Sequence, residues 1–174
     1  MNGYDLKKQY ERAIGDELLE ACGVQARFLR YGDDREEPDV IYRLPNEETL
    51  GIEIATAYYE DSDAKQEWTL ARGDRPHPPD GVELRFGGAI REPDRLICER
   101  VQGELVDKCR RRYLGADHVW LCIKRHAPLD DQEAVEACIG MLRVPTNHCF
   151  DAIFVTYQDC GRSGPVQAIR IATT

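Results

Sequence analysis

The segment from residue 39 to residue 55, DVIYRLPNEETLGIEIA, most limits how this chain can fold. It contains two short runs rich in β-branched and aromatic residues, separated by the turn-forming sequence PNEE, which is typical of a β-hairpin. Side chains alternate between the two faces of a strand, so Ile52 and Ile54 share one face and Glu53 points to the other. If a helix packs on each face, Glu53 is buried or borders a cleft.

Patterns on either side of this hairpin predict an α/β fold, with a mixed sheet flanked by helices. Apolar residues recur at helical spacing in two long segments, and several short runs have the composition of strands. A chain of 174 residues, 42% of them hydrophobic, is expected to form a single domain over residues 1–174. The expected elements are helices over 3–22, 94–113 and 129–142, and strands over 24–31, 39–44, 49–55, 118–125, 150–157 and 166–172.

The segment between the hairpin and the second long helix is the least regular part of the sequence. Residues 58–72 have a weak helical pattern, and residues 73–92 are rich in proline and glycine. A loop of this length is uncommon in a compact domain unless it has a function. We therefore expect residues 73–92 to form a flap beside a binding cleft.

Two charged residues fall within the apolar stripes of the long helices. On a helical wheel of about 100° per residue, Glu17 lies about 20° from Leu6, inside the stripe that includes Ile14. In the second long helix, Lys108 lies about 20° from Ile97 by the same measure. Glu17 could instead reach water from the edge of its stripe, and Lys108 could extend its ammonium group to water along apolar surface.

A further acid, Asp39, stands at the first position of its strand, directly after Pro38. An acid at this position could simply cap a turn. However, Glu17, Asp39, Glu53 and Lys108 lie on four elements that must pack together. Buried charges are tolerated when they are paired or bind a metal ion. Three acids and a lysine at one point have the composition of a site for a hard cation, with a proton donor or acceptor nearby.

The motif and the order of the expected elements resemble those of the PD-(D/E)XK nuclease superfamily, which has the restriction-endonuclease-like αβββαβ core. The matching residues are Pro38 and Asp39, followed after 13 intervening residues by Glu53. The resemblance implies that Asp39 and Glu53 hold one or two Mg²⁺ or Mn²⁺ ions, with the carbonyl group of Ile54 completing part of the shell. It also implies a further metal ligand from the first helix, which would be Glu17.

The sequence departs from the superfamily pattern at Ala55, where the motif has a lysine. Members of the superfamily can carry this lysine on a neighbouring element, and Lys108 is the best-placed substitute, with Lys65 as a second candidate. Alternatively, the site has lost its activity and the protein is a binding module for nucleic acid or protein. The resemblance implies catalytic roles for Asp39, Glu53 and Lys108 in a metal-dependent nuclease acting on DNA.

Acidic side chains alone cannot bind a polyanion, so a nuclease also needs basic residues near its cleft. A run of three arginines lies near the end of the second long helix, where basic residues also suit the helix dipole, and further cations lie in the long loop. The candidate nucleic-acid-binding residues are Arg72, Arg75, His77, Arg110, Arg111 and Arg112.

The net charge of −9 argues mildly against a partner bound by simple electrostatics. It favours a third interpretation, in which a small acidic protein binds a basic partner. Seven cysteines without a Cys-x-x-Cys pair indicate reduced thiols and a cytoplasmic location. No apolar run approaches 18 residues, so we expect no membrane association. Nucleic acid is the expected partner, and a homodimer is compatible with this reading.

Overall fold

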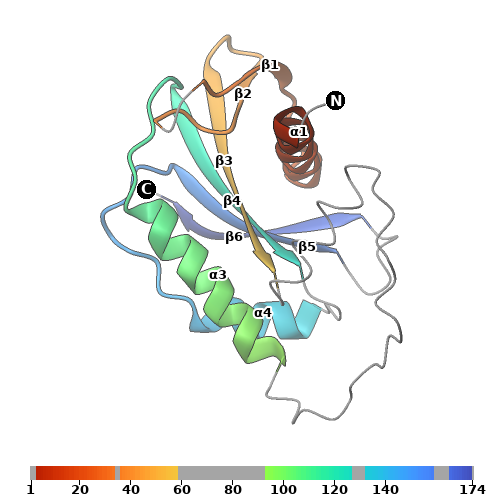
Figure 1. The fold of residues 1–174 in the computed structure, drawn as a ribbon, viewed down its shortest axis with the longest axis vertical. Helices are drawn as coiled ribbons and strands as arrows, with labels where there is room; N and C mark the ends of the chain where they lie inside the picture. The colour runs from red at the N-terminus through yellow and green to blue at the C-terminus, as the bar shows by residue number, and fades with distance from the viewer. Residues whose placement is uncertain (1–2, 34–35, 59–92, 127–131, 159–164, 174) are drawn as a thin grey trace.

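A computed structural model describes residues 3–33, 36–58, 93–126, 132–158 and 165–173 (Figure 1). Three helices and six strands lie within these ranges, in the order of the chain: α1 (Gly3–Ala21), β1 (Arg27–Tyr31), β2 (Val40–Arg43), β3 (Thr49–Tyr58), α3 (Pro93–Cys109), β4 (His118–His126), α4 (Gln132–Met141), β5 (Ala152–Gln158) and β6 (Val166–Thr173). The weak helical pattern over 58–72, the flap expected over 73–92, and Lys65, Arg72, Arg75 and His77 fall outside the described residues, apart from Tyr58.

The six strands form one mixed sheet in the order β1-β2-β3-β4-β5-β6. Strands β1 to β3 form an antiparallel meander, β3, β4 and β5 are parallel, and β6 is antiparallel to β5. The predicted mixed sheet with flanking helices is therefore confirmed. The segment HVWLCIKR, predicted as a buried strand, is β4 and lies between β3 and β5.

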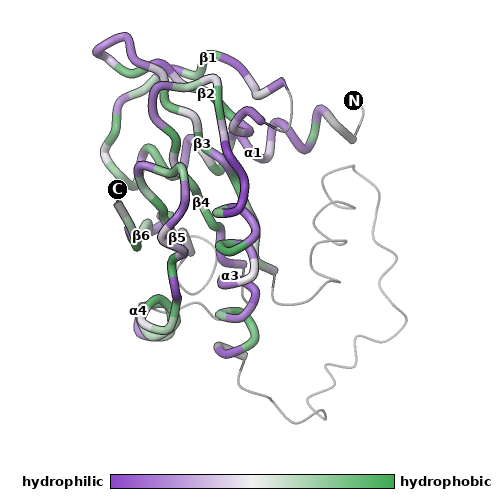
Figure 2. Tube along the Cα trace, turned by 90° about the vertical axis from the view of Figure 1, so that its left-hand side faces the viewer, coloured by the Kyte–Doolittle hydropathy of each residue, from purple (hydrophilic) through white to green (hydrophobic). Residues whose placement is uncertain are grey.

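Helices cover both faces of the sheet (Figure 1). On one face, the α1 residues Ile14 and Leu18 belong to a core that includes Ile52 and Ile54 of β3. On the other face, the core includes residues of α3 and the alternate β3 residues Ala55 and Ala57. In Figure 2 both α1 and α3 alternate between hydrophilic and hydrophobic colours along their length, as amphipathic helices do. The alternation predicted for β3 is confirmed, and Glu53 belongs to the face that α3 covers.

Helix α1 packs with a different face from the one the sequence indicates. Its buried residues are Glu11, Ile14, Gly15, Leu18 and Leu19, whereas Leu6 and Tyr10 are only partly buried. A Cβ atom at Gly15 would lie 2.6 Å from the hydroxyl oxygen of Tyr42, so this glycine lets α1 approach β2 closely. On the wheel this face is centred about 130° from Glu17, at about the position of Glu11.

The cysteine prediction needs a correction, because the structure joins Cys98 of α3 to Cys138 of α4 in a disulfide. Their Cα atoms are 5.4 Å apart, which lies within the usual range for a bridge. The expectation of reduced thiols is therefore wrong for this pair. Four of the other cysteines are free in the structure, namely Cys22, Cys109, Cys122 and Cys149.

Within the described part of the chain, no helix is both long enough and apolar enough to cross a membrane.

Candidate active site

The register between β2 and β3 brings the two predicted acids together. Val40 pairs with Ile52, so the next position along this antiparallel ladder sets Asp39 opposite Glu53. The ladder ends here, because β2 begins at Val40 while β3 continues to Tyr58. Residues directly opposite each other in such a ladder have Cβ atoms about 5 Å apart. Asp39 and Glu53 therefore meet where β3 separates from β2.

Beyond the end of β2, the carboxylate of Asp39 replaces the β2 backbone as the hydrogen-bond partner of β3. The backbone N–H of Ile54 donates to Oδ2 of Asp39 at 2.8 Å. In a strand, the N–H and C=O of one residue point to the same side, so the carbonyl group of Ile54 faces the same edge. The structure thus places the predicted backbone ligand beside the predicted carboxylate ligand.

The loop that carries Asp39 is fixed by several hydrogen bonds. The guanidinium group of Arg30 donates to both carboxylate oxygens of Glu37, at 2.6 and 2.7 Å. These bonds, with one from the backbone N–H of Asp33, lower the pKa of Glu37 to about 2. The backbone N–H of Gly32 donates to the carbonyl group of Asp39 at 3.0 Å. Asp39 therefore sits on a loop that is held at several points.

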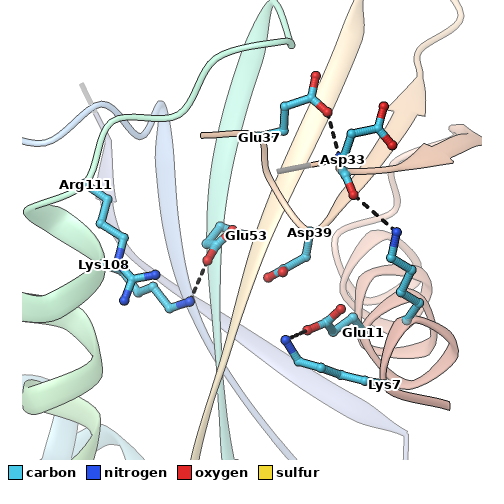
Figure 3. A pocket seen from close by; sticks show the side chains of 10 residues that line it. Lys7, Glu11, Asp33, Glu37, Asp39, Glu53, Lys108 and Arg111 are labelled. Atoms are coloured by element: carbon cyan, nitrogen blue, oxygen red, sulfur yellow. Dashed lines mark hydrogen bonds and ion pairs between the residues drawn. The ribbon is translucent and has the colours of Figure 1, made fainter. Parts of the chain in front are cut away.

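Lys108 of α3 contacts Glu53 of β3, as expected from its position within the apolar stripe of the helix. Its ammonium nitrogen lies 2.5 Å from Oε1 of Glu53 (Figure 3). The side chains of Glu53 and Lys108 are only 5% and 14% exposed. The structure therefore brings together three of the four charged residues that the sequence singles out, namely Asp39, Glu53 and Lys108.

Glu53 is the acid in this group whose pKa is shifted most. Burial and the nearby charge of Asp39 raise its pKa to about 7, against the opposing effect of Lys108. Tyr113 lies on the same side, with its hydroxyl oxygen buried, and burial and the charge of Glu53 raise the pKa of that hydroxyl. Lys108 thus only partly opposes the combined effect of burial and of Asp39 on Glu53.

These residues line a cleft of about 920 Å³ between α1 and α3 (Figure 3). Its walls carry charges of both signs, from α1, from the segment before β2, from β3 and from α3. The described residues that line it are Lys7, Lys8, Glu11, Gly32, Asp33, Glu37, Asp39, Glu53, Lys108 and Arg111.

The fourth predicted residue, Glu17, is not among the described residues that line the cleft. Its carboxylate lies 3.8 Å from the ammonium group of Lys124 instead. The α1 acid in the cleft is Glu11, which is buried and pairs with Lys7 at 2.9 Å. Sequence reasoning missed Glu11 because the wheel was centred on Leu6. Gly15, which shares its face, was the signal that could have located it.

Ala55, which stands where the superfamily motif has a lysine, lines a second hollow. This hollow adjoins the cleft and has a volume of about 230 Å³. We call it the Ala55 hollow. Ala55 and Ile54 line it, together with four residues that also line the cleft. The shared residues are Lys7, Glu11, Asp39 and Lys108. Two lysines, Lys7 and Lys108, therefore both line the hollow beside Ala55.

The three arginines that follow α3 differ in whether they line the cleft. Helix α3 ends at Cys109, so all three lie beyond it rather than in its last turn, as expected from the longer helix. Arg111 lines the cleft and donates to Asp107 at 2.8 Å. Arg110 and Arg112 are exposed, and neither is among the described residues that line the cleft.

The donor set of the cleft fits a hard cation that is only partly held by protein. Among the described residues, no group of three or more histidines, cysteines or acids is arranged to hold a metal ion. The carboxylate of Asp39 does contact the backbone of Ile54, and Glu53 stands opposite Asp39 in the register of β2 and β3. Burial, and then the charge of Asp39, raise the pKa of Glu53 to about 7. Mg²⁺ is often bound by one or two carboxylates, with waters and substrate phosphates completing its shell. The residues fit an ion of this kind, not a preformed cage.

Comparisons with protein-family models, with curated proteins and with solved structures find no match to this chain.

Proposed function

We propose that this protein is a Mg²⁺- or Mn²⁺-dependent nuclease of the PD-(D/E)XK type, which hydrolyses phosphodiester bonds of nucleic acid, with DNA as the expected substrate. The observation that carries the proposal is that Asp39, Glu53 and Lys108 meet in one charged cleft from three separate elements. A three-stranded meander followed by α3 and the parallel strand β4 also supports the restriction-endonuclease-like αβββαβ core.

The roles follow from the position of each group. The carboxylates of Asp39 and Glu53, with the carbonyl group of Ile54, would hold the cation. A bound cation of this type lowers the pKa of a water ligand and neutralises charge on a phosphate group. Lys108 holds Glu53 in place, and its ammonium group would stabilise negative charge that develops on the phosphate. Arg111 at the rim supplies positive charge for the substrate backbone.

One observation favours a second function, a binding module of the same fold without catalytic activity. Ala55 removes the motif lysine, and Lys108 is engaged with Glu53. In that case the cleft would bind nucleic acid or protein without cleaving it. The two functions differ in a measurable way, because only the nuclease requires a cation for its activity.

The deciding experiment combines calorimetry with Mn²⁺ and cleavage of single- and double-stranded DNA and RNA at pH 8. Asp39→Asn and Glu53→Gln should abolish both Mn²⁺ binding and cleavage, because each removes a ligand charge. Lys108→Met should abolish cleavage and retain Mn²⁺ binding, because a group that acts on the transition state is not a ligand. Glu99→Gln, an exposed acid of α3, is the matched control and should behave as wild type.

Mn²⁺ binding by the wild type without cleavage of any substrate would favour the binding module. If the wild type binds no Mn²⁺, the nuclease proposal fails.

A further inference from the structure

A second lysine, Lys7 of α1, faces the two acids from the wall opposite Lys108 (Figure 3). It lines both the cleft and the Ala55 hollow. Its ammonium group interacts electrostatically with Asp39 and Glu53 as well as with its neighbour Glu11. The acids therefore lie between two ammonium groups that come from different helices.

The two lysines differ in what they can reach. Lys108 is 14% exposed and its ammonium group is hydrogen-bonded to Glu53. Lys7 is 58% exposed, so a ligand that enters the cleft can contact it without breaking a buried ion pair. An ammonium group on a flexible stem is well suited to a phosphate oxygen.

The pairing of Lys7 with Glu11 differs from three other ion pairs between residues four positions apart, which lie in α1, in α3 or at the end of α3. Both partners are about half exposed or more in the pairs Arg12–Asp16, Arg95–Glu99 and Asp107–Arg111. Glu11 is only 10% exposed, although its partner is open to water. Exposed pairs contribute little to stability, and an apolar residue at the buried position would pack without the cost of burying a carboxylate. The buried acid thus holds an exposed lysine of the cleft wall at 2.9 Å.

We propose that Lys7, held by Glu11 as a positioning residue, contacts a phosphate group of the bound strand on the α1 side of the cleft. This inference rests on the proposed function, in which the ligand is a nucleic acid. Lys7 would share with Lys108 the space beside Ala55, Lys7 facing the substrate and Lys108 facing Glu53.

Binding of a fluorescent single- or double-stranded DNA 20-mer, measured in EDTA over a range of KCl concentrations, tests this contact separately from cleavage. The slope of log K against log salt is negative, and loss of one phosphate contact decreases its magnitude by about 0.7 to 0.9. Lys7→Met should show this decrease, and Lys7→Arg should restore the slope. Arg95→Met removes an exposed charge of α3 outside the cleft and should leave the slope unchanged. Circular dichroism confirms that each variant is folded.

Glu11→Gln tests the positioning role, because it retains the charge of Lys7. We expect an unchanged salt slope and slower Mn²⁺-dependent cleavage. An unchanged slope in Lys7→Met, an equal decrease in Arg95→Met, or no DNA binding by the wild type would overturn the inference. If the wild type binds DNA but does not cleave it with Mn²⁺, the nuclease proposal fails, and the slopes still decide whether Lys7 contacts phosphate.

Discussion

Removing the ammonium group of Lys108 should destabilise the protein in a pH-dependent way. Lys108→Met keeps an unbranched apolar side chain at this position of α3, but leaves Glu53 without its ammonium partner. Because Glu53 is 5% exposed, its charge cannot turn to water. The substitution therefore isolates the electrostatic part of the interaction.

The magnitude follows from the burial of both groups. Breaking a buried ion pair by removing one partner typically costs about 3 to 5 kcal/mol. Burial and Asp39 already raise the pKa of Glu53 to about 7, and loss of Lys108 removes the main opposing effect. The folded state therefore binds a proton more tightly than the unfolded state, so stability falls as pH rises. We expect a loss of about 3 kcal/mol at pH 8.5 and about 1 kcal/mol at pH 5.5, where Glu53 is protonated.

Thermal and urea denaturation at the two pH values measure this loss. A loss of about 3 kcal/mol should lower the Tm by about 6 to 12 °C in a chain of this size. In a Glu53→Gln background, Lys108→Met should cost less and show no pH dependence. Arg95→Met, which opens an exposed pair, should cost about 0.5 kcal/mol or less. An equal loss of stability at both pH values, or no loss at pH 8.5, would refute the claim that Lys108 and Glu53 form a buried ion pair.

Two further predictions concern stability away from the acids. Gly15→Ala should destabilise by about 1 to 3 kcal/mol in urea denaturation, because its Cβ would lie 2.6 Å from the Tyr42 hydroxyl oxygen and α1 would have to move; unchanged stability would contradict this packing. The hydrogen bond of His118 to Glu48, and the charge of Asp151, raise the pKa of His118, so its contribution is present at low pH and is lost as pH rises through that pKa. The Tm difference between wild type and His118→Gln should therefore be larger at pH 5.5 than at pH 8.5, and the opposite trend would contradict the assignment.

The sheet and its two faces could be predicted because their signal is local. Period-two alternation in β3 assigns Ile52 and Glu53 to opposite faces whatever the rest of the chain does. The position of Lys108 was predictable for a similar reason, since α3 packs with the stripe that includes Ile97 and Leu105. In both cases the apolar residues themselves define the buried surface.

Helix α1 shows where this reasoning fails. Its buried face contains Gly15 and Glu11, and neither contributes to an apolar stripe. The helix is oriented by the fit between Gly15 and Tyr42, which are 27 positions apart in the sequence. A helical wheel uses only the residues of one helix, so it cannot predict a contact of that kind. Glu17 was therefore expected at a position that Glu11 occupies.

The pairing of Glu53 with Lys108 bears directly on whether the cleft can also hold a cation. A carboxylate accepts hydrogen bonds or metal bonds through two oxygens, and the bond to Lys108 uses Oε1. Glu53 and Asp39 would then be able to hold a cation while Lys108 stays in place. Burial is the main cause of the raised pKa of Glu53, and the charge of Asp39 adds to it; a cation at that point would favour the charged carboxylate against both effects. Mn²⁺ binding should therefore release a proton near pH 7, and calorimetry in buffers of different ionisation enthalpy would detect it; no proton release would argue that the cation does not contact Glu53.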